Sequence, residues 1–288
     1  MASRVSKSSA ASKSSKRKPK LGQHFLTDSD AARRIVDATG NLSSRTVLEI
    51  GPGRGAITDL LIPRAKRVIG IELDRVLAAQ LRLRYATKPN VEILESDFVT
   101  ADFDSMLGRK PGPLHDLRPT QLETVDVVGN LPYYITSEIV LRILNLHQNI
   151  ERAVIMVQRE VADRIAAEPG SRSYGLLSAT AQLFARVEKL FTIPPGAFSP
   201  PPLVHSSVLR LTMAPRLEDL HVGEEPFIAF LKLTFAQKRK TLLNNLRGLY
   251  ADAVVRAALK SSGLRTDVRA EDMSLEKTAA VYRALQKG

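Results

Sequence analysis

The chain has 288 residues, of which 44% are hydrophobic and 25% charged, a balance typical of soluble globular proteins that excludes global disorder. This length predicts about two domains. The chain contains no cysteine, which excludes disulfides and thiolate metal sites, and it has no apolar run approaching the roughly 18 residues of a membrane-spanning helix. Its five histidines are scattered without metal-ligand spacing. We therefore expect no metal site and no membrane partner.

The net charge of +12 is concentrated at the two ends of the chain. Residues 1–20 carry seven Lys and Arg and no acid, and residues 227–288 carry twelve against five acids, whereas the part between is close to neutral. This distribution indicates a polyanionic partner, although solvated helix faces would give a similar count. Residues 1–19 are too rich in Ser and Lys to bury a core, so we expect a disordered basic arm that binds RNA or serves as a targeting segment.

From residue 46 onwards, short apolar runs alternate with amphipathic ones. The strand-like runs are 46–50, 67–72, 91–94, 125–129 and 153–158. The helix-like runs between and after them are 56–61, 75–85, 137–146 and 159–167. Such alternation predicts a parallel sheet covered by helices on both faces.

The alternation of strand-like and helix-like runs ends after the fifth predicted strand. Residues 186–211 contain two strand-like runs around a Pro-rich loop, which predicts a hairpin that completes the sheet. Beyond Pro215 the spacing of Leu, Phe and Ala is helical throughout. The sequence therefore predicts an α/β domain over residues 20–213 and a small all-α domain over residues 214–288.

A glycine-rich turn, Glu49–Gly55, joins the first predicted strand to its helix. Gly51 lies nearest the strand end and allows the backbone to approach a ligand closely. Glu72 ends the next strand and can accept hydrogen bonds from both ribose hydroxyls, and Asp97 follows the third strand, where it could receive an adenine amino group. The glycine order is not that of a pyrophosphate cradle, so a ligand without phosphates is favoured, and S-adenosylmethionine has none.

The segment Asn130–Tyr133 (Asn-Leu-Pro-Tyr) follows the fourth predicted strand. It offers the Asn130 side-chain carbonyl, backbone carbonyls beside a proline, and the aromatic face of Tyr133. A nucleobase amino group is a poor nucleophile, because its lone pair is delocalised into the ring. Two carbonyls that accept its hydrogens would favour the pyramidal form, while the aromatic ring stacks on the base. An isolated turn with Asn and Pro is also common without any such function.

Together these motifs resemble the KsgA-type ribosomal RNA adenine dimethyltransferases. The resemblance runs in order from about residue 18 to the C-terminus and rests on Leu21–Leu26, Glu49–Gly55, Ile71–Asp74, Asn130–Tyr133, Gln158–Glu160, Tyr174–Gly175, Ala197–Pro202 and Gln237–Thr241. It implies a Rossmann-like, S-adenosylmethionine-dependent methyltransferase sheet with a small all-α C-terminal domain. It also implies dimethylation of two adjacent adenosines near the 3′ end of small-subunit rRNA during ribosome assembly.

The same resemblance implies roles for individual residues. His24 and Leu26 would contact the methionine end of the cofactor, where position 24 is His although many relatives have Asn. Gly51, Glu72 and Asp97 would hold the rest of the cofactor, and Asn130 would lie against it as well. Asn130 and Tyr133 would handle the target base, with Phe198 stacked on its other face.

The basic residues towards the C-terminus indicate where RNA docks. Between Phe227 and Ala251 there are five basic residues and no acid, and Lys238, Arg239 and Lys240 lie at the junction of two helical patterns. We expect these three side chains to bind the phosphate backbone. We further expect a monomeric cytoplasmic protein that acts on the immature small ribosomal subunit.

Two alternatives remain open at the level of sequence. One is the related methyltransferase of large-subunit rRNA that confers macrolide resistance, which shares the nucleotide site and a similar Asn-x-Pro-Tyr segment. The Pro-rich residues 194–202 and the basic residues 238–240 favour the small-subunit enzyme. The other is a ribosome-assembly binding factor whose methylation activity is incidental.

Overall fold

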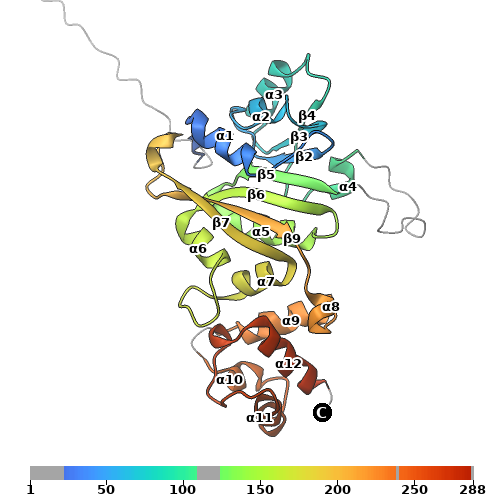
Figure 1. Cartoon of the computed structure of the whole chain (residues 1–288), viewed down its shortest axis with the longest axis vertical. Helices are drawn as coiled ribbons and strands as arrows, with labels where there is room; N and C mark the ends of the chain where they lie inside the picture. The colour runs from blue at the N-terminus through green and yellow to red at the C-terminus, as the bar shows by residue number, and fades with distance from the viewer. Residues whose placement is uncertain (1–22, 109–123, 238–239, 287–288) are drawn as a thin grey trace, which may run out of the picture.

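The computed structural model describes residues 23–108, 124–237 and 240–286 (Figure 1). The basic arm expected over residues 1–19 lies outside these ranges, as do Lys238 and Arg239. Within the described ranges, no helix combines the length and the apolar character needed to span a membrane.

One seven-stranded sheet forms the centre of the molecule, with the strand order β4-β3-β2-β5-β6-β9-β7. The strands β4 to β6 in this order are parallel, and β9 and β7 join antiparallel at the β6 edge. The strand bounds are β2 Thr46–Ile50, β3 Arg67–Glu72, β4 Val91–Glu95, β5 Val125–Asn130, β6 Ile150–Gln158, β7 Ala185–Ile193 and β9 Ser206–Met213. The predicted parallel sheet and the predicted hairpin are both confirmed.

Helices cover both faces of the sheet because its buried strands alternate their side chains between two apolar layers. In β6, Ala153, Ile155 and Val157 face one layer, whereas Val154 and Met156 face the other. The second layer is closed by α1 and α2, and the first by α4 to α7. The helix bounds are α1 Ser29–Asp37, α2 Thr58–Leu61, α3 Arg75–Arg84, α4 Phe103–Met106, α5 Thr136–Asn145, α6 Arg159–Ile165 and α7 Leu176–Phe184.

Beyond β9 the described residues are helical, as the spacing predicted. The elements are α8 Leu217–Leu220, α9 Glu224–Thr234, α10 Leu242–Leu246, α11 Asp252–Ser261 and α12 Leu275–Leu285. They lie beyond α7 in Figure 1, at the end of the molecule away from α3. Rings of Phe227, Phe230 and Tyr282 pack together, with centroids 5.2 Å apart between Phe230 and Tyr282, and these helices share one apolar core with α7.

Several local features differ from the sequence prediction: α1 and α4 were not predicted, and β6 begins at Ile150, before residue 153. The helix predicted from residue 56 begins at Thr58, because the glycine-rich turn extends through Gly55, whose φ is +84°. Helix α7 was not predicted, since six of its nine residues are buried and it lacks the polar face that gives a helical period. The two-residue strands β1 (Phe25–Leu26) and β8 (Phe198–Ser199) pair antiparallel across the fold and are too short to leave a pattern.

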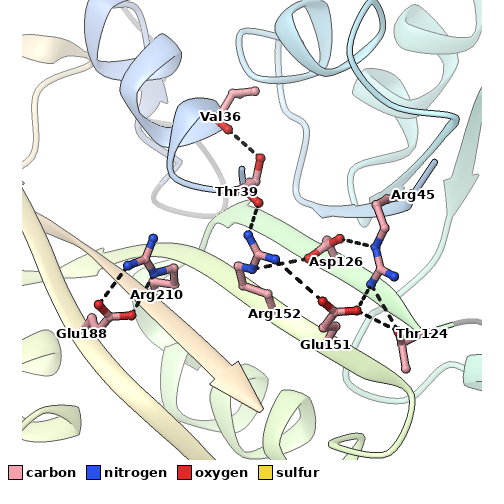
Figure 2. A network of polar contacts seen from close by, with 9 residues as sticks. All are labelled: Val36, Thr39, Arg45, Thr124, Asp126, Glu151, Arg152, Glu188 and Arg210. Carbon is pink, nitrogen blue, oxygen red and sulfur yellow. Dashed lines mark hydrogen bonds and ion pairs between the residues drawn. The ribbon is translucent and has the colours of Figure 1, made fainter. Parts of the chain in front are cut away.

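A polar network stabilises the amino-terminal ends of the central strands, opposite the ends where the glycine-rich turn lies (Figure 2). Asp126 in β5 has a side chain only 2% exposed, and it accepts a hydrogen bond from Arg45 Nε at 2.8 Å. Arg152 lies 3.8 Å from the other Asp126 oxygen and donates to the Thr39 carbonyl just after α1. Glu151 pairs with Arg45 at 2.7 Å. The network thus ties α1 to the sheet and neutralises a buried carboxylate.

We expect Arg45→Gln to lower the free energy of unfolding by about 3 kcal/mol. The substitution removes the ion pair at 2.8 Å and leaves the buried Asp126 carboxylate with Arg152 alone, at 3.8 Å. Arg210→Gln is the matched control: Arg210 forms a bidentate pair with Glu188 whose side chains are 33% and 39% exposed. Such an exposed pair contributes at most about 1 kcal/mol. Urea denaturation followed by circular dichroism measures both values, and equal losses would contradict the importance of burial at Asp126.

Candidate functional site

A cavity of about 800 Å³, counted with the solvent at its mouth, opens at the carboxyl ends of the central parallel strands. This is the edge at which open α/β sheets bind ligands. Of the described residues, no Lys or Arg lines it. Its walls are formed by Gln23, His24, Phe25, Ile50, Gly51, Gly53, Ile71, Glu72, Leu73, Ser96, Asp97, Phe98, Asn130, Leu131, Pro132, Tyr133, Tyr134, Ile135 and Ile139.

The glycine-rich turn forms the floor of the cavity. Gly51 has a φ of +66°, and its amide donates to the Ile71 carbonyl at 2.9 Å, which holds the turn against β3. Gly53 has a φ of +58°, and a Cβ there would come within 3.1 Å of the Phe25 ring. A side chain at position 53 would therefore be strained by the backbone conformation, and the Phe25 ring would have to shift slightly to accommodate it.

Glu72 and Asp97 bring two carboxylates to one side of the cavity. Glu72 accepts hydrogen bonds from the amides of Gly53 and Asp74, each at 2.9 Å, so it also holds the glycine-rich turn in place. Burial raises the pKa of Glu72, and these two amides act in the opposite direction. Asp97 accepts from the amide of Val99 at 2.8 Å. Because a carboxylate has about four acceptor positions, both groups retain capacity for ligand hydroxyls or amino groups.

Asn130, at the end of β5, is held by the chain segment that precedes α1. Its amide nitrogen donates to the His24 carbonyl at 2.9 Å, which leaves its side-chain oxygen as an acceptor in the cavity wall. The carbonyl of Pro132 accepts from the Thr136 hydroxyl at 2.9 Å and from the Ile135 amide at 3.3 Å. None of the described residues donates to the Leu131 carbonyl. The loop therefore presents two unused carbonyl oxygens.

Tyr133 and His24 form the aromatic part of the wall. Their ring centroids lie 5.5 Å apart with an interplanar angle of 30°. The Tyr133 hydroxyl shares a hydrogen bond with Ser206 Oγ at 2.8 Å, and burial raises its pKa. His24 Nδ1 donates to the Pro200 carbonyl at 2.8 Å. Both rings are thus fixed by contacts outside the Asn130–Tyr133 loop itself.

The structure brings most of the predicted site residues together. His24, Gly51, Glu72, Asp97, Asn130 and Tyr133 all line the cavity. Leu26 and Phe198 do not: they face each other in the β1–β8 pair and are 6% and 4% exposed. A base-stacking role for Phe198 therefore needs a movement of this side chain. Lys240 is exposed, and its neighbours Lys238 and Arg239 lie outside the described residues.

Several wall residues were not predicted. Phe25 covers the glycine-rich turn and carries the Arg54 guanidinium 4.4 Å from its ring centroid. Tyr134 lines the mouth and is 57% exposed. Phe98 and Ile139 are apolar and conform to the patterns of buried core, so no sequence signal separated them from packing residues. For Tyr134, the adjacent Tyr133 was the available signal.

This combination defines the class of protein. A Rossmann-like sheet, a glycine-rich turn without a phosphate cradle, two carboxylates on the following strands and an Asn-Leu-Pro-Tyr loop at the fourth strand are the features of a methyltransferase that acts on base amino groups. The profile of the ribosomal RNA adenine dimethylase family matches residues 14–287. The chain belongs to this family.

Relatives in the same family resemble the chain over nearly its full length. The ribosomal RNA small subunit methyltransferase A of Koribacter versatilis is 61% identical over 281 residues, which cover 97% of this chain and 99% of that protein. The protein of the same name from Acidobacterium capsulatum is 56% identical and covers 95% and 93%.

Solved structures share the fold. A dimethyladenosine transferase from Plasmodium falciparum superposes with a TM-score of 0.75 at 23% identity, covering 92% of this chain and 98% of that one. The 23S rRNA methyltransferase ErmE gives a TM-score of 0.67 at 28% identity, covering 91% and 99%.

Glu49 is a buried carboxyl beneath the glycine-rich turn. It is 1% exposed, and its one hydrogen bond from a side chain comes from the Thr58 hydroxyl at 2.6 Å, counted over the described residues. Burial raises its pKa to about 8, and the negative charges of Asp59 and Glu72 add to the rise, against the opposing effect of Thr58. The group is therefore protonated in the folded protein at neutral pH.

The stability of the protein should depend on pH through Glu49. A Glu in the unfolded chain titrates at about 4.3, so between this pH and about 8 the folded state holds one more proton. Stability therefore falls as pH rises through this window, by up to about 1.4 kcal/mol per unit. Glu49→Gln removes this loss, and its advantage over the wild type in urea denaturation should grow from pH 6 to pH 9.

Glu95→Gln is the matched control, because Glu95 is also a strand glutamate of this sheet, at the end of β4, but its side chain is 41% exposed. Its difference from the wild type should be the same at both pH values. A pH-independent difference for Glu49→Gln as well would mean that Glu49 is ionised in the folded protein.

Proposed function

We propose that the protein transfers methyl groups from S-adenosylmethionine to the exocyclic amino nitrogens of two adjacent adenosines near the 3′ end of small-subunit rRNA. One observation carries this proposal: the carboxylates of β3 and β4 and the free carbonyls of the Asn130–Tyr133 loop line the same cavity. A nucleoside-type cofactor and a base amino group can therefore meet there. Membership of the ribosomal RNA adenine dimethylase family supports the same activity.

The residues present fit S-adenosylmethionine. The described wall of the cavity offers carboxylate acceptors and apolar surface but no Lys or Arg, which suits a ligand with hydroxyls, a purine and a positive charge and no phosphate. When bound, the cofactor supplies an electrophilic methyl group on a sulfonium. We assign the ribose of the cofactor to Glu72 and its adenine to Asp97, with Gly51 in the glycine-rich turn beside it. We assign the methionine end to His24, Asn130 and the backbone at Leu26.

The Asn130–Tyr133 loop would bind and orient the target base. The Asn130 side-chain oxygen and the Leu131 carbonyl are the two acceptors left for the hydrogens of the adenine amino group. Accepting both hydrogens stabilises the pyramidal, nucleophilic nitrogen. No strong general base is needed, because the proton leaves after the nitrogen has become positively charged. Tyr133 stacks on the base with the ring face that His24 leaves free, and Phe198 would close the other side after moving.

The setting of the reaction belongs to the same proposal. The protein would act as a monomer, and the carboxylate and carbonyl chemistry requires no metal ion. The relatives named above are bacterial, so we infer a cytoplasmic protein that acts on the immature small subunit. Residues 20–213 would form the methyltransferase domain, residues 214–288 a helical RNA-contacting domain, and residues 1–19 a supplementary basic arm.

The two alternatives are less well supported. The relatives at 61% and 56% identity are named for the small subunit, whereas the large-subunit methyltransferase ErmE is 28% identical. A binding factor with incidental methylation would not need the Asn130 amide to be oriented by a residue 106 positions away. Catalysis is the function that accounts for this arrangement.

We expect Asn130→Ala to lower the single-turnover rate of methyl transfer by about 10²–10³, because it removes one carbonyl that acts mainly on the transition state. Affinity for S-adenosylmethionine should change by a small factor only. Mass spectrometry of dimethyladenosine in small-subunit rRNA measures the rate, and calorimetry measures the affinity.

Asn90→Ala is the matched control, since the Asn90 amide also donates to backbone carbonyls, those of Ile62 and Ala65, but away from the cavity. It should cost stability without a comparable loss of rate. A near-normal single-turnover rate for Asn130→Ala would contradict the carbonyl mechanism. Wild-type protein that leaves small-subunit rRNA unmethylated would contradict the proposed function.

RNA docking through Lys238, Arg239 and Lys240 gives a separate prediction. Replacing all three by Gln should leave cofactor affinity unchanged and reduce the slope of log K against log salt for binding of the immature subunit by about 2–3. The triple variant Arg256→Gln, Lys260→Gln and Lys277→Gln removes the same charge from α11 and α12. An equal change of slope in both variants would assign the effect to total charge instead of this cluster.

A further inference from the structure

The loop between β8 and β9, residues 200–205 (Pro-Pro-Pro-Leu-Val-His), is attached to the cavity at both ends. At its start, the Pro200 carbonyl accepts the hydrogen bond from His24 Nδ1 at 2.8 Å. Just after its end, Ser206 Oγ is bonded to the Tyr133 hydroxyl at 2.8 Å. Because His24 and Tyr133 both line the cavity, the loop lies beside its mouth.

This loop presents apolar side chains to solvent. Leu203 is fully exposed, at 102% of its reference area, and Val204 is 44% exposed. A single exposed Leu is ordinary on a protein surface. Here, however, two apolar side chains stand together on a short loop in which three consecutive prolines restrict the backbone, and both ends of the loop are held by the active-site wall.

A cation lies at the base of the same loop. The amide of Arg159, at the start of α6, donates to the His205 carbonyl at 2.9 Å. The Arg159 side chain is exposed and forms no ion pair with any described residue. An apolar tip with an unpaired cation at its base fits a nucleic acid, in which bases and phosphates alternate, better than it fits an apolar protein surface.

We propose that Leu203, supported by Val204, is a wedge that enters the rRNA base stack and fills the gap left when a target adenosine turns into the cavity. The proposal rests on the proposed function. An adenine amino group stacked within RNA cannot reach the Asn130 oxygen, so the base must leave the stack, and the vacated space then favours refilling by the same base. Apolar side chains inserted between bases oppose this return, as in proteins that kink nucleic acids.

The proposed wedge also accounts for how the protein could hold two adjacent target adenosines. With two adjacent adenosines, the nucleotide that remains stacked is the immediate neighbour of the one in the cavity. Leu203 would contact the exposed face of that neighbour, and Arg159 would bind a phosphate of the same strand. Leu203 is thus a positioning residue, not a catalytic one.

The test uses small subunits reconstituted with rRNA that carries 2-aminopurine in place of the adenosine next to the target. Wild-type protein should replace the stacked target base beside it with the Leu203 side chain, which removes the quenching by that base and raises the fluorescence. Leu203→Ser should reduce the rise to less than half and slow single-turnover methylation by about tenfold, since one stacking face is worth about tenfold or more in equilibrium constant. Leu203→Phe should restore both, and affinity for S-adenosylmethionine should stay unchanged in each variant.

Leu249→Ser is the matched control, because Leu249 is also an exposed leucine, at 63%, but follows α10 in the helical part. It should behave as wild type in both measurements. Normal fluorescence and normal rate in Leu203→Ser would overturn the wedge while leaving the proposed function intact. Weaker subunit binding with a normal fluorescence rise would also overturn it, and would point to a protein contact of the loop. Absence of methylation by the wild type would instead remove the proposed function.

Discussion

The hydrogen bond from the Asn130 amide to the His24 carbonyl is the contact on which the rest of the site depends. It fixes the end of β5 to the segment that leads into β1. It also decides which atom of Asn130 points away as an acceptor. The His24 ring extends the same connection, because it packs on Tyr133 and bonds to Pro200. Three segments that are distant in sequence are therefore held in one arrangement around the cavity.

One edge of the sheet contributes to stability, and the opposite edge carries the binding site. At the amino-terminal ends of the strands, Arg45 and Arg152 neutralise the buried Asp126 and tie α1 to the sheet. At the carboxyl ends, polar groups such as Glu72 are only partly satisfied by the protein and keep acceptor capacity for a ligand. A rigid, neutralised base thus supports an edge with unused hydrogen-bonding groups, which a binding site needs.

Acidic and basic side chains also lie in different parts of the molecule. The described cavity wall holds carboxylates without Lys or Arg, so it suits a cationic, phosphate-free cofactor and would repel the phosphates of RNA. The basic residues lie at the ends of the chain and at exposed positions such as Arg159. RNA would therefore be held at the periphery, while a single base enters the cavity. The exposed loop with Leu203 is bonded to the cavity wall at both ends, so a wedge there would act beside the base that enters the cavity.

The sequence by itself determined the sheet and the carboxyl-end residues. Short apolar runs predicted β2 and β3 to the residue, and a residue that directly follows a parallel strand must lie at the carboxyl edge. For this reason Gly51, Glu72, Asp97 and Asn130 could be placed together without coordinates. Only the tertiary structure decided which atoms remain free, because the partners of Asn130 and Tyr133, the His24 carbonyl and the Ser206 hydroxyl, are far away in the chain. The pairing of β1 with β8, which buries Leu26 and Phe198 away from the cavity wall, and the exposure of Leu203 both depend on contacts between residues far apart in the chain, and no periodicity encodes such contacts.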